Sequence, residues 1–100
     1  MAEVRLNIHQ NGPDAFEIFD EDGMVGEMIF DINGTDLTVY HTEVEPEKEG
    51  QGYAKMLLES MVAYVREEKL MVRPMCPYVQ LQFSRHEDLY QDIWNKINEK

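Results

Sequence analysis

Basic residues, cysteine and long apolar runs are all scarce in this sequence of 100 residues, and each scarcity excludes a class of protein. Lysine and arginine together number 9, against 20 aspartate and glutamate residues, which gives a formal net charge of -11. A chain with this charge repels phosphate backbones and anionic bilayers, so nucleic-acid binding and membrane docking are disfavoured. Cationic partners and amine substrates suit it better.

Cys76 is the single cysteine, so no internal disulfide can form, as is usual in a reducing compartment. No apolar run approaches the roughly 20 residues of a membrane span, and the N-terminus lacks the pattern of a signal peptide. We therefore predict a soluble cytoplasmic protein that is a monomer or weak dimer. The length and the 43% hydrophobic content suit one core, so residues 1–100 are expected to form a single domain.

Up to about Val44, apolar residues recur with the period of two that is typical of strands with one buried face. Short turn signals separate four such stretches, and Asn33-Gly34 is the strongest of them because both residues tolerate positive φ. The pattern predicts an antiparallel meander of four strands, the last running from Leu37 to Val44. The side chains expected to be buried in the first three strands are Val4, Leu6, Ile8, Phe16, Ile18, Met24, Val25, Met28, Ile29 and Phe30.

After Ala54 the apolar period becomes helical, which predicts a long helix from about Gly50 to Lys69. A short strand follows over Met71 to Met75, and the helix between it and the fourth strand makes this last pair parallel. Pro77 suits the first turn of a second helix. That helix is expected to bury Val79, Leu81 and Phe83, and a last helix capped by Asp88 is expected to bury Leu89, Tyr90, Ile93, Trp94 and Ile97. The predicted fold class is α+β, a mixed α/β sandwich.

Gly50-Gln51-Gly52 lies where the fourth strand gives way to the long helix. Two glycines let the chain turn sharply and leave N–H groups free at the positive end of the helix dipole, which together form a small anion cradle. No Gly-Lys-Ser/Thr sequence follows, and the third glycine of a dinucleotide fingerprint is missing. From these residues alone, an anion site and a structural turn both remain open.

The position of this loop after a four-stranded meander resembles the Gcn5-related N-acetyltransferase superfamily, and in particular its short, single-domain branch. The resemblance covers about residues 4–95. The segments that carry it are His41-Thr42-Glu43-Val44, Gly50-Gln51-Gly52 with Ala54, Met75-Cys76-Pro77-Tyr78, Arg85-His86 and Tyr90-Gln91-Asp92. It implies that acetyl-CoA is the cofactor and lies in a splay between the fourth and fifth strands.

By this resemblance, the backbone of Thr42 to Val44 pairs with the pantetheine arm, and the glycine loop contacts the pyrophosphate. The residues predicted to bind the cofactor are Thr42, Val44, Gly50, Gln51, Gly52, Tyr53, Ala54 and Lys55. Glu47 and Glu49 stand where relatives often carry Arg or Gln, and only Lys48 and Lys55 relieve the negative charge nearby. We therefore expect weaker cofactor binding than in those relatives.

Cys76 and His41 are the candidate catalytic residues. In the short branch the cysteine of the Cys-Pro step lies near the thioester, and a thiol at a helix N-terminus favours the thiolate; a small buried side chain is the alternative role. His41, close to the splay, can act as a general base or have a structural role. The three histidines lack metal-ligand spacing with Cys76, so no metal site is predicted.

The predicted function is acetyl-CoA-dependent N-acetylation of a primary amine. An open acceptor site would suit a protein or peptide as the acceptor. Transfer proceeds either directly, with His41 as base, or through an acetyl group carried by Cys76. The alternative is a non-catalytic module that binds acyl-CoA or docks on a basic protein. A thiol redox protein is disfavoured because no resolving cysteine exists.

Overall fold

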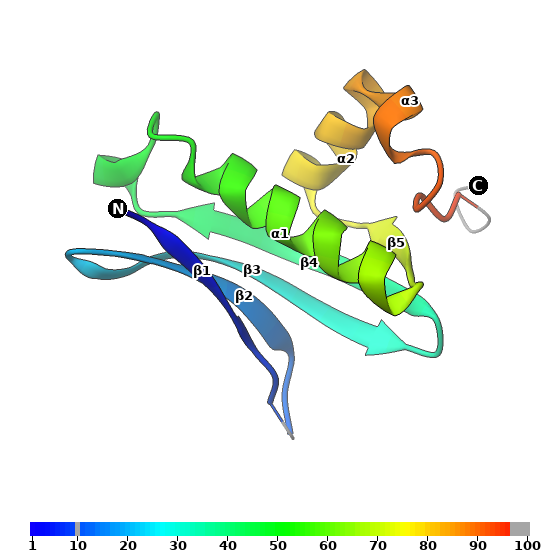
Figure 1. Ribbon diagram of the computed structural model, residues 1–100, viewed down its shortest axis with the longest axis horizontal. Coiled ribbons are helices and arrows are strands. Elements are labelled where there is room, and N and C mark those ends of the chain that lie inside the picture. Colours follow the sequence, from blue (N-terminus) through cyan, green and yellow to red (C-terminus); the bar gives the residue numbers. More distant parts are fainter. Residues whose placement is uncertain (10, 97–100) are drawn as a thin grey trace.

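The computed structural model describes residues 1–9 and 11–96, which form one five-stranded sheet with helices packed on it (Figure 1). The strands are β1 (Glu3–Asn7), β2 (Asp14–Asp20), β3 (Gly23–Asn33), β4 (Asp36–Val44) and β5 (Met71–Pro74). They lie in the order β1-β2-β3-β4-β5. The first four pair antiparallel and β5 pairs parallel with β4. The predicted fold class, with its meander and parallel fifth strand, is confirmed.

The helices are the short 3-10 helix η1 (Pro46–Lys48), α1 (Tyr53–Glu68), α2 (Pro77–Arg85) and α3 (Glu87–Tyr90). Figure 1 shows α1, α2 and α3 on the same side of the sheet, which leaves the opposite face of β1–β4 without a covering helix in the described part of the chain. The apolar stripe of α1 is buried as its period predicts, through Leu57, Leu58, Met61, Val62 and Val65. None of the described helices is long and apolar enough to cross a membrane.

The long helix begins at Tyr53 and not at about Gly50, as the sequence had suggested. Gly50 and Gly52 have φ angles of 87° and 82°, in the left-handed region that a helix cannot contain. The two glycines therefore form a loop that turns the chain from η1 into the first turn of α1.

Several apolar side chains of the meander are exposed, contrary to the prediction. Leu6 is 39% exposed on the edge strand β1, Ile8 is 56% exposed beyond the end of that strand, and Met24 is 44% exposed near the start of β3. An edge strand has only one neighbour, and the helices pack mainly over the middle of the sheet. The alternation of apolar residues thus predicted the strands correctly, but it predicted burial for side chains at the edge and ends of the sheet that are in fact exposed.

In α2, Val79 and Phe83 are buried but Leu81 is 46% exposed. Positions four apart share one face of a helix, whereas the position between them points away from that face. The alternating pattern in this segment led to the wrong expectation for Leu81.

The last predicted helix is wrong in length and in its burial pattern. α3 ends at Tyr90, His86 and not Asp88 is its N-cap residue, and Leu89 is 55% exposed. The chain then runs beside the free edge of β5, where Val72 N donates to Ile93 O at 2.6 Å and Asn95 N donates to Val72 O at 2.9 Å. These hydrogen bonds satisfy an otherwise bare strand edge. Ile93 and Trp94 are buried as predicted, and Ile97 lies outside the described residues.

Candidate active site

The strands β4 and β5 separate after a short paired segment. Their pairing ends at Val39 opposite Pro74, and the last contact is the Met75 N–H donating to Val39 O at 3.0 Å. Pro74 has no N–H to continue the ladder. In β4 the register shifts by one residue at Tyr40, and such a bulge bends a strand. The remainder of β4, from Tyr40 to Val44, therefore has no β5 partner, and the sheet opens beside the start of α2.

Cys76 and Thr42 face each other across this opening. Cys76 is the N-cap residue of α2, is 2% exposed, and donates its S–H to Thr42 Oγ1 at 3.2 Å. A threonine hydroxyl both donates and accepts hydrogen bonds, but it is not a base that could activate the thiol. The structure thus brings together two side chains that are 34 positions apart in the sequence.

His41 lies on the other face of the sheet, because successive side chains of a strand point to opposite faces. Its Nε2 is 2.8 Å from Glu43 Oε1, and both side chains are exposed. A carboxylate only accepts hydrogen bonds, so Nε2 is the donor, and Nδ1 has no partner among the described residues. Glu43 therefore fixes the orientation of the His41 ring, on the face of the sheet opposite Cys76.

The glycine loop and the start of α1 form a cleft of about 250 Å³. It is lined by Val44, Lys48, Glu49, Gly50, Gly52, Tyr53, Ala54, Lys55 and Tyr78. Six of the eight residues predicted to bind the cofactor are therefore brought together. The other two, Thr42 and Gln51, do not line this cleft: Thr42 contacts Cys76, and Gln51 is exposed at the loop.

The cleft can hold an anionic group through its backbone. The first N–H groups of α1 have no acceptor within the helix, and no side chain caps them. A Cβ built on Gly50 or Gly52 would meet no atom within 4 Å, so the space next to both glycines is open. A helix N-terminus with open space before it suits a phosphate. The residues present thus fit the pyrophosphate of the donor that the resemblance implies.

The two lysines of the cleft differ in their availability. Lys48 Nζ is 2.9 Å from Asp20 Oδ2 and 2.6 Å from Asp22 Oδ2, and these hydrogen bonds raise the pKa of the ammonium. Lys55 pairs with no acidic residue in the described part of the chain. The expectation that Lys48 relieves the acidity of the loop is therefore wrong, because its charge is already neutralised. Lys55 remains the available cation, and Glu49 is a carboxylate in the cleft wall.

The hydrogen bond from Lys48 holds the pKa of Asp20 below its ordinary value of 3.8. A carboxyl whose pKa is lower in the folded state stabilises the fold above its unfolded-state value, and that contribution disappears as the pH falls through the lowered pKa. The contacts of Asp20 are therefore fully present at neutral pH.

Tyr78, on the first turn of α2, is a lining residue that the sequence did not single out. Burial raises the pKa of its phenol, so the hydroxyl stays protonated and can donate a hydrogen bond into the cleft. The feature of the sequence that could have identified Tyr78 as a lining residue is its position directly after Cys76-Pro77. A helix that begins at the opening necessarily turns one of its first side chains toward it.

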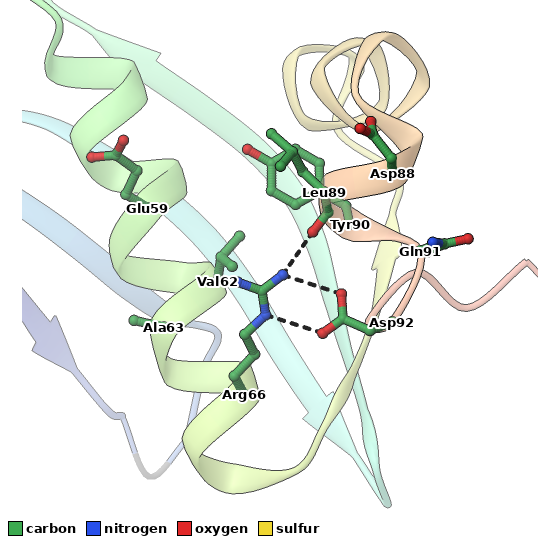
Figure 2. Close-up of a pocket in the computed structure, with 9 residues that line it drawn as sticks. All are labelled: Glu59, Val62, Ala63, Arg66, Asp88, Leu89, Tyr90, Gln91 and Asp92. Carbon is green, nitrogen blue, oxygen red and sulfur yellow. Dashed lines mark hydrogen bonds and ion pairs between the residues drawn. The ribbon is translucent and has the colours of Figure 1, made fainter.

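A larger cleft, of about 550 Å³, lies between α1 and the segment that begins at α3 (Figure 2). In Figure 2 the Arg66 side chain turns toward the α3 segment, where it donates to both oxygens of Asp92 at 3.1 Å and to the Leu89 carbonyl at 2.7 Å. Arg66 is the single cation among the nine lining residues and is already paired, while Glu59 and Asp88 are carboxylates. This cleft is a poor site for phosphate despite its size.

Comparisons with known proteins agree with this geometry. A family profile described as GCN5-related N-acetyl-transferase matches residues 15–93. The solution structure of a GCN5-like putative N-acetyltransferase from Staphylococcus aureus superposes on this chain with a TM-score of 0.67, and the two sequences are 28% identical. The match covers 91% of this chain and 87% of that one. A ribosomal-protein-alanine N-acetyltransferase from Brucella melitensis is 17% identical and has a TM-score of 0.66, over 95% and 92% of the two chains.

The ribosomal-protein-S18-alanine N-acetyltransferase of Escherichia coli, 16% identical, has a TM-score of 0.64 and matches 81% of this chain but 54% of its own. At such identities these two enzymes share the fold with this chain. No curated protein sequence matches it significantly.

Proposed function

The chain belongs to the GCN5-related N-acetyltransferase family, whose members transfer acyl groups from acetyl-CoA, and from this premise we propose that it acetylates a cationic primary amine. The observation that carries the proposal is the cleft at the start of α1, which combines uncapped helix N–H groups, Lys55 and the exposed space beside two glycines. It adjoins Val44 at the end of β4, so a ligand held there by its phosphates can extend toward the opening.

Donor binding is assigned to the backbone of Gly50 to Lys55 and to the unpaired segment of β4 that contains Thr42 and Val44. The N–H groups and Lys55 hold the pyrophosphate, and free backbone groups of β4 bind the pantetheine arm as an added strand would. Acetyl-CoA supplies the activated acetyl thioester. Tyr78 contributes a protonated hydroxyl to the same cleft.

The acceptor is proposed to approach from the uncovered face of the sheet, which is acidic. Glu17, Glu27 and Glu43 are directly opposite one another on β2, β3 and β4. Like charges in such positions destabilise a sheet. No lysine or arginine in the described ranges pairs with any of the three, since Arg5, opposite Glu17, binds Glu3 at 2.7 Å. A lysine-rich peptide would neutralise this row, which favours it over a neutral acceptor.

Transfer is proposed to be direct. His41 lies on the acceptor face with a free Nδ1, and Glu43 fixes its ring. Nδ1 would remove one proton from the acceptor ammonium, and the amine would form a bond to the acetyl carbon at the opening. The C–S bond of the thioester would break, and CoA would leave as a thiolate that takes up the second proton lost by the nitrogen. Cys76 then has a structural role at the N-cap of α2, because its buried thiol is hydrogen-bonded to Thr42 and has no base beside it in the described structure.

Mass spectrometry separates the direct route from a route through Cys76. We expect no hydroxylamine-sensitive acetyl adduct on the intact protein under single-turnover conditions, and we expect Cys76→Ser to retain kcat within about fivefold, because serine can also donate to Thr42. An adduct that forms in the wild type and disappears in Cys76→Ser would instead assign the thiol as the acetyl carrier.

Replacing Glu49 with arginine is expected to tighten CoA binding about tenfold, because a carboxylate in the cleft wall is exchanged for a cation. Calorimetric titration at two salt concentrations measures this effect, and the affinity of the variant should fall more steeply with salt than that of the wild type. Glu47→Arg is the matched control, since Glu47 is two residues away and does not line the cleft. Equal gains in both variants would show a general charge effect and contradict the placement of the phosphates.

The function itself is tested by titrating CoA and acetyl-CoA and by following CoA thiol release with a lysine-rich peptide as acceptor. The proposal expects binding of both ligands and peptide-dependent release. The acidic face also suits a non-catalytic docking module, which would bind the peptide without binding CoA. A module that senses acyl-CoA would bind the ligand and release no thiol.

A further inference from the structure

Asp20, at the end of β2, makes contacts with both ends of the glycine loop. Its Oδ2 lies 2.9 Å from Lys48 Nζ, at the end of η1, and accepts a hydrogen bond from the Tyr53 hydroxyl at 2.9 Å, at the start of α1. Its Oδ1 accepts the backbone N–H of Asp22 at 2.8 Å. The side chain of Asp20 is 1% exposed and that of Lys48 is 14% exposed. One buried carboxylate therefore fixes the residues on either side of positions 49–52.

The loop between these two anchors has little of its own to hold its shape. Gly50 and Gly52 are at positive φ, and glycine loses more backbone freedom on ordering than any other residue. Neither Gly50 nor Gln51 makes a hydrogen bond within the described part of the chain, and the N-terminus of α1 has no side-chain cap. The order of the loop must therefore come from the anchors at its ends.

Lys48 is close enough to line the phosphate cleft, yet its ammonium is paired with Asp20 and Asp22. A cation placed for electrostatic binding would be expected to face the ligand. Here the Lys48 ammonium instead forms ion pairs that connect η1 to the turn after β2. Lys48 therefore contributes to the shape of the glycine loop and not to a positive charge facing the phosphates.

From these contacts we infer that Asp20 is a positioning residue for donor binding: it holds the glycine loop, through Lys48 and Tyr53, in the shape that receives the phosphates. The inference rests on the proposed function, since it takes the glycine loop as the site of the donor. Asp20 does not line the cleft, and it acts through the two lining residues that it binds.

The sign of the effect distinguishes positioning from charge. Asp20→Asn removes a negative charge near an anionic ligand, so electrostatics alone predicts tighter binding. Positioning predicts the opposite. If the released loop spends about a tenth of its time in the receptive shape, the apparent Kd for CoA and the KM for acetyl-CoA rise about tenfold. The kcat at saturating acetyl-CoA should stay within about twofold, because the reacting groups are unaffected.

Asp22→Asn is the matched control. It removes the same charge but keeps an amide oxygen that can accept from Lys48 in place of Asp22 Oδ2, so the Lys48 contact can be retained, and the 65% exposed Asp22 side chain does not bind Tyr53. Both oxygens of Asp20 accept hydrogen bonds, and an amide at that position cannot replace them all. Its Kd for CoA should equal that of the wild type or be lower. Tyr53→Phe removes a single hydroxyl from the network and should raise the Kd in the same direction as Asp20→Asn. Because Tyr53 also lines the cleft, its raised Kd supports positioning only together with faster amide exchange without ligand, and this pair of measurements tests the proposal even if Asp20→Asn is poorly folded.

Amide hydrogen exchange of Glu49 and Met56, measured without ligand, is an independent readout, because their N–H groups on either side of the loop donate to Pro46 O at 3.3 Å and to Gly52 O at 3.0 Å. We expect faster exchange in Asp20→Asn and Tyr53→Phe than in the wild type and Asp22→Asn. Unchanged exchange, or CoA binding as tight as in the wild type, would overturn the positioning role while leaving the function intact. Faster exchange in a protein whose wild type binds no CoA would confirm that Asp20 orders the loop and would refute the proposed donor site.

Discussion

Replacing His41 with alanine is expected to lower kcat for amine acetylation by a factor of about 10²–10⁴, the usual contribution of a general base. The KM for acetyl-CoA should stay within about twofold, because His41 lies on the face of the sheet opposite the donor cleft. The reason is the orientation of the ring: Glu43 holds Nε2 at 2.8 Å and leaves Nδ1 to accept the proton of the acceptor. Steady-state kinetics with varied acetyl-CoA and varied peptide measures both parameters.

Two further variants test whether the loss of kcat in His41→Ala is specific to the imidazole of His41. Glu43→Gln keeps an oxygen that can accept the Nε2 hydrogen, so its kcat should fall much less than that of His41→Ala. His86→Ala changes another exposed histidine, at the C-cap of α2, and should leave kcat unchanged. An active His41→Ala enzyme would contradict the role of the base, and an equally inactive His86→Ala enzyme would show that the loss is not specific to the acceptor face.

The sequence predicts most of this fold because its signals are local. A period of two marks the four strands of the meander, a helical period marks α1, and the helix between β4 and β5 requires the parallel pairing that the structure contains. The glycine loop is equally local. Gly50 and Gly52 predict a sharp turn before a helix, and both do adopt positive φ.

The parts that could not be predicted depend on residues distant in sequence. Asp20 precedes Lys48 and Tyr53 by 28 and 33 positions, and nothing in its local pattern indicates a buried carboxylate. Thr42 and Cys76 are 34 positions apart and meet because β4 and β5 separate after Val39. The sequence named both residues but could not show that their side chains bind each other. The alternation of a strand does place His41 on the opposite face from Thr42, but only the contact of Thr42 with Cys76 shows which face the thiol occupies.

The C-terminal segment shows a second kind of failure, in which one periodic pattern fits two structures. Leu89, Tyr90, Ile93 and Trp94 have helical spacing, and the N–H groups of Ile93 and Trp94 still donate to Tyr90 O. The Ile93 carbonyl and the Asn95 N–H, however, pair with Val72 at the free edge of β5, where a helix would not place them. Both arrangements bury Ile93 and Trp94. What decides between them is the unpaired edge of a neighbouring strand, which the segment's own residues do not reveal.

Phe83→Ala is therefore expected to be the most destabilising single substitution in this half of the chain. Phe83 is fully buried, and its ring centroid lies 4.7 Å from that of Tyr90 and 5.6 Å from that of Trp94. Phe83 thus packs α2 against Tyr90, at the end of α3, and against Trp94, in the segment that pairs with β5. Removing the ring loses its transfer free energy and leaves a cavity, at a cost of about 3–5 kcal/mol.

Such a loss is a large part of the roughly 5–15 kcal/mol that stabilises a domain of this size. Urea unfolding should show a lower midpoint with an unchanged m-value. The matched control is Leu81→Ala on the same helix, where the side chain is 46% exposed and the expected loss is below about 1 kcal/mol. Comparable losses in the two variants would mean that α2 packs through a different face. A small loss in Phe83→Ala alone would mean that the aromatic cluster does not hold the C-terminal segment against the sheet.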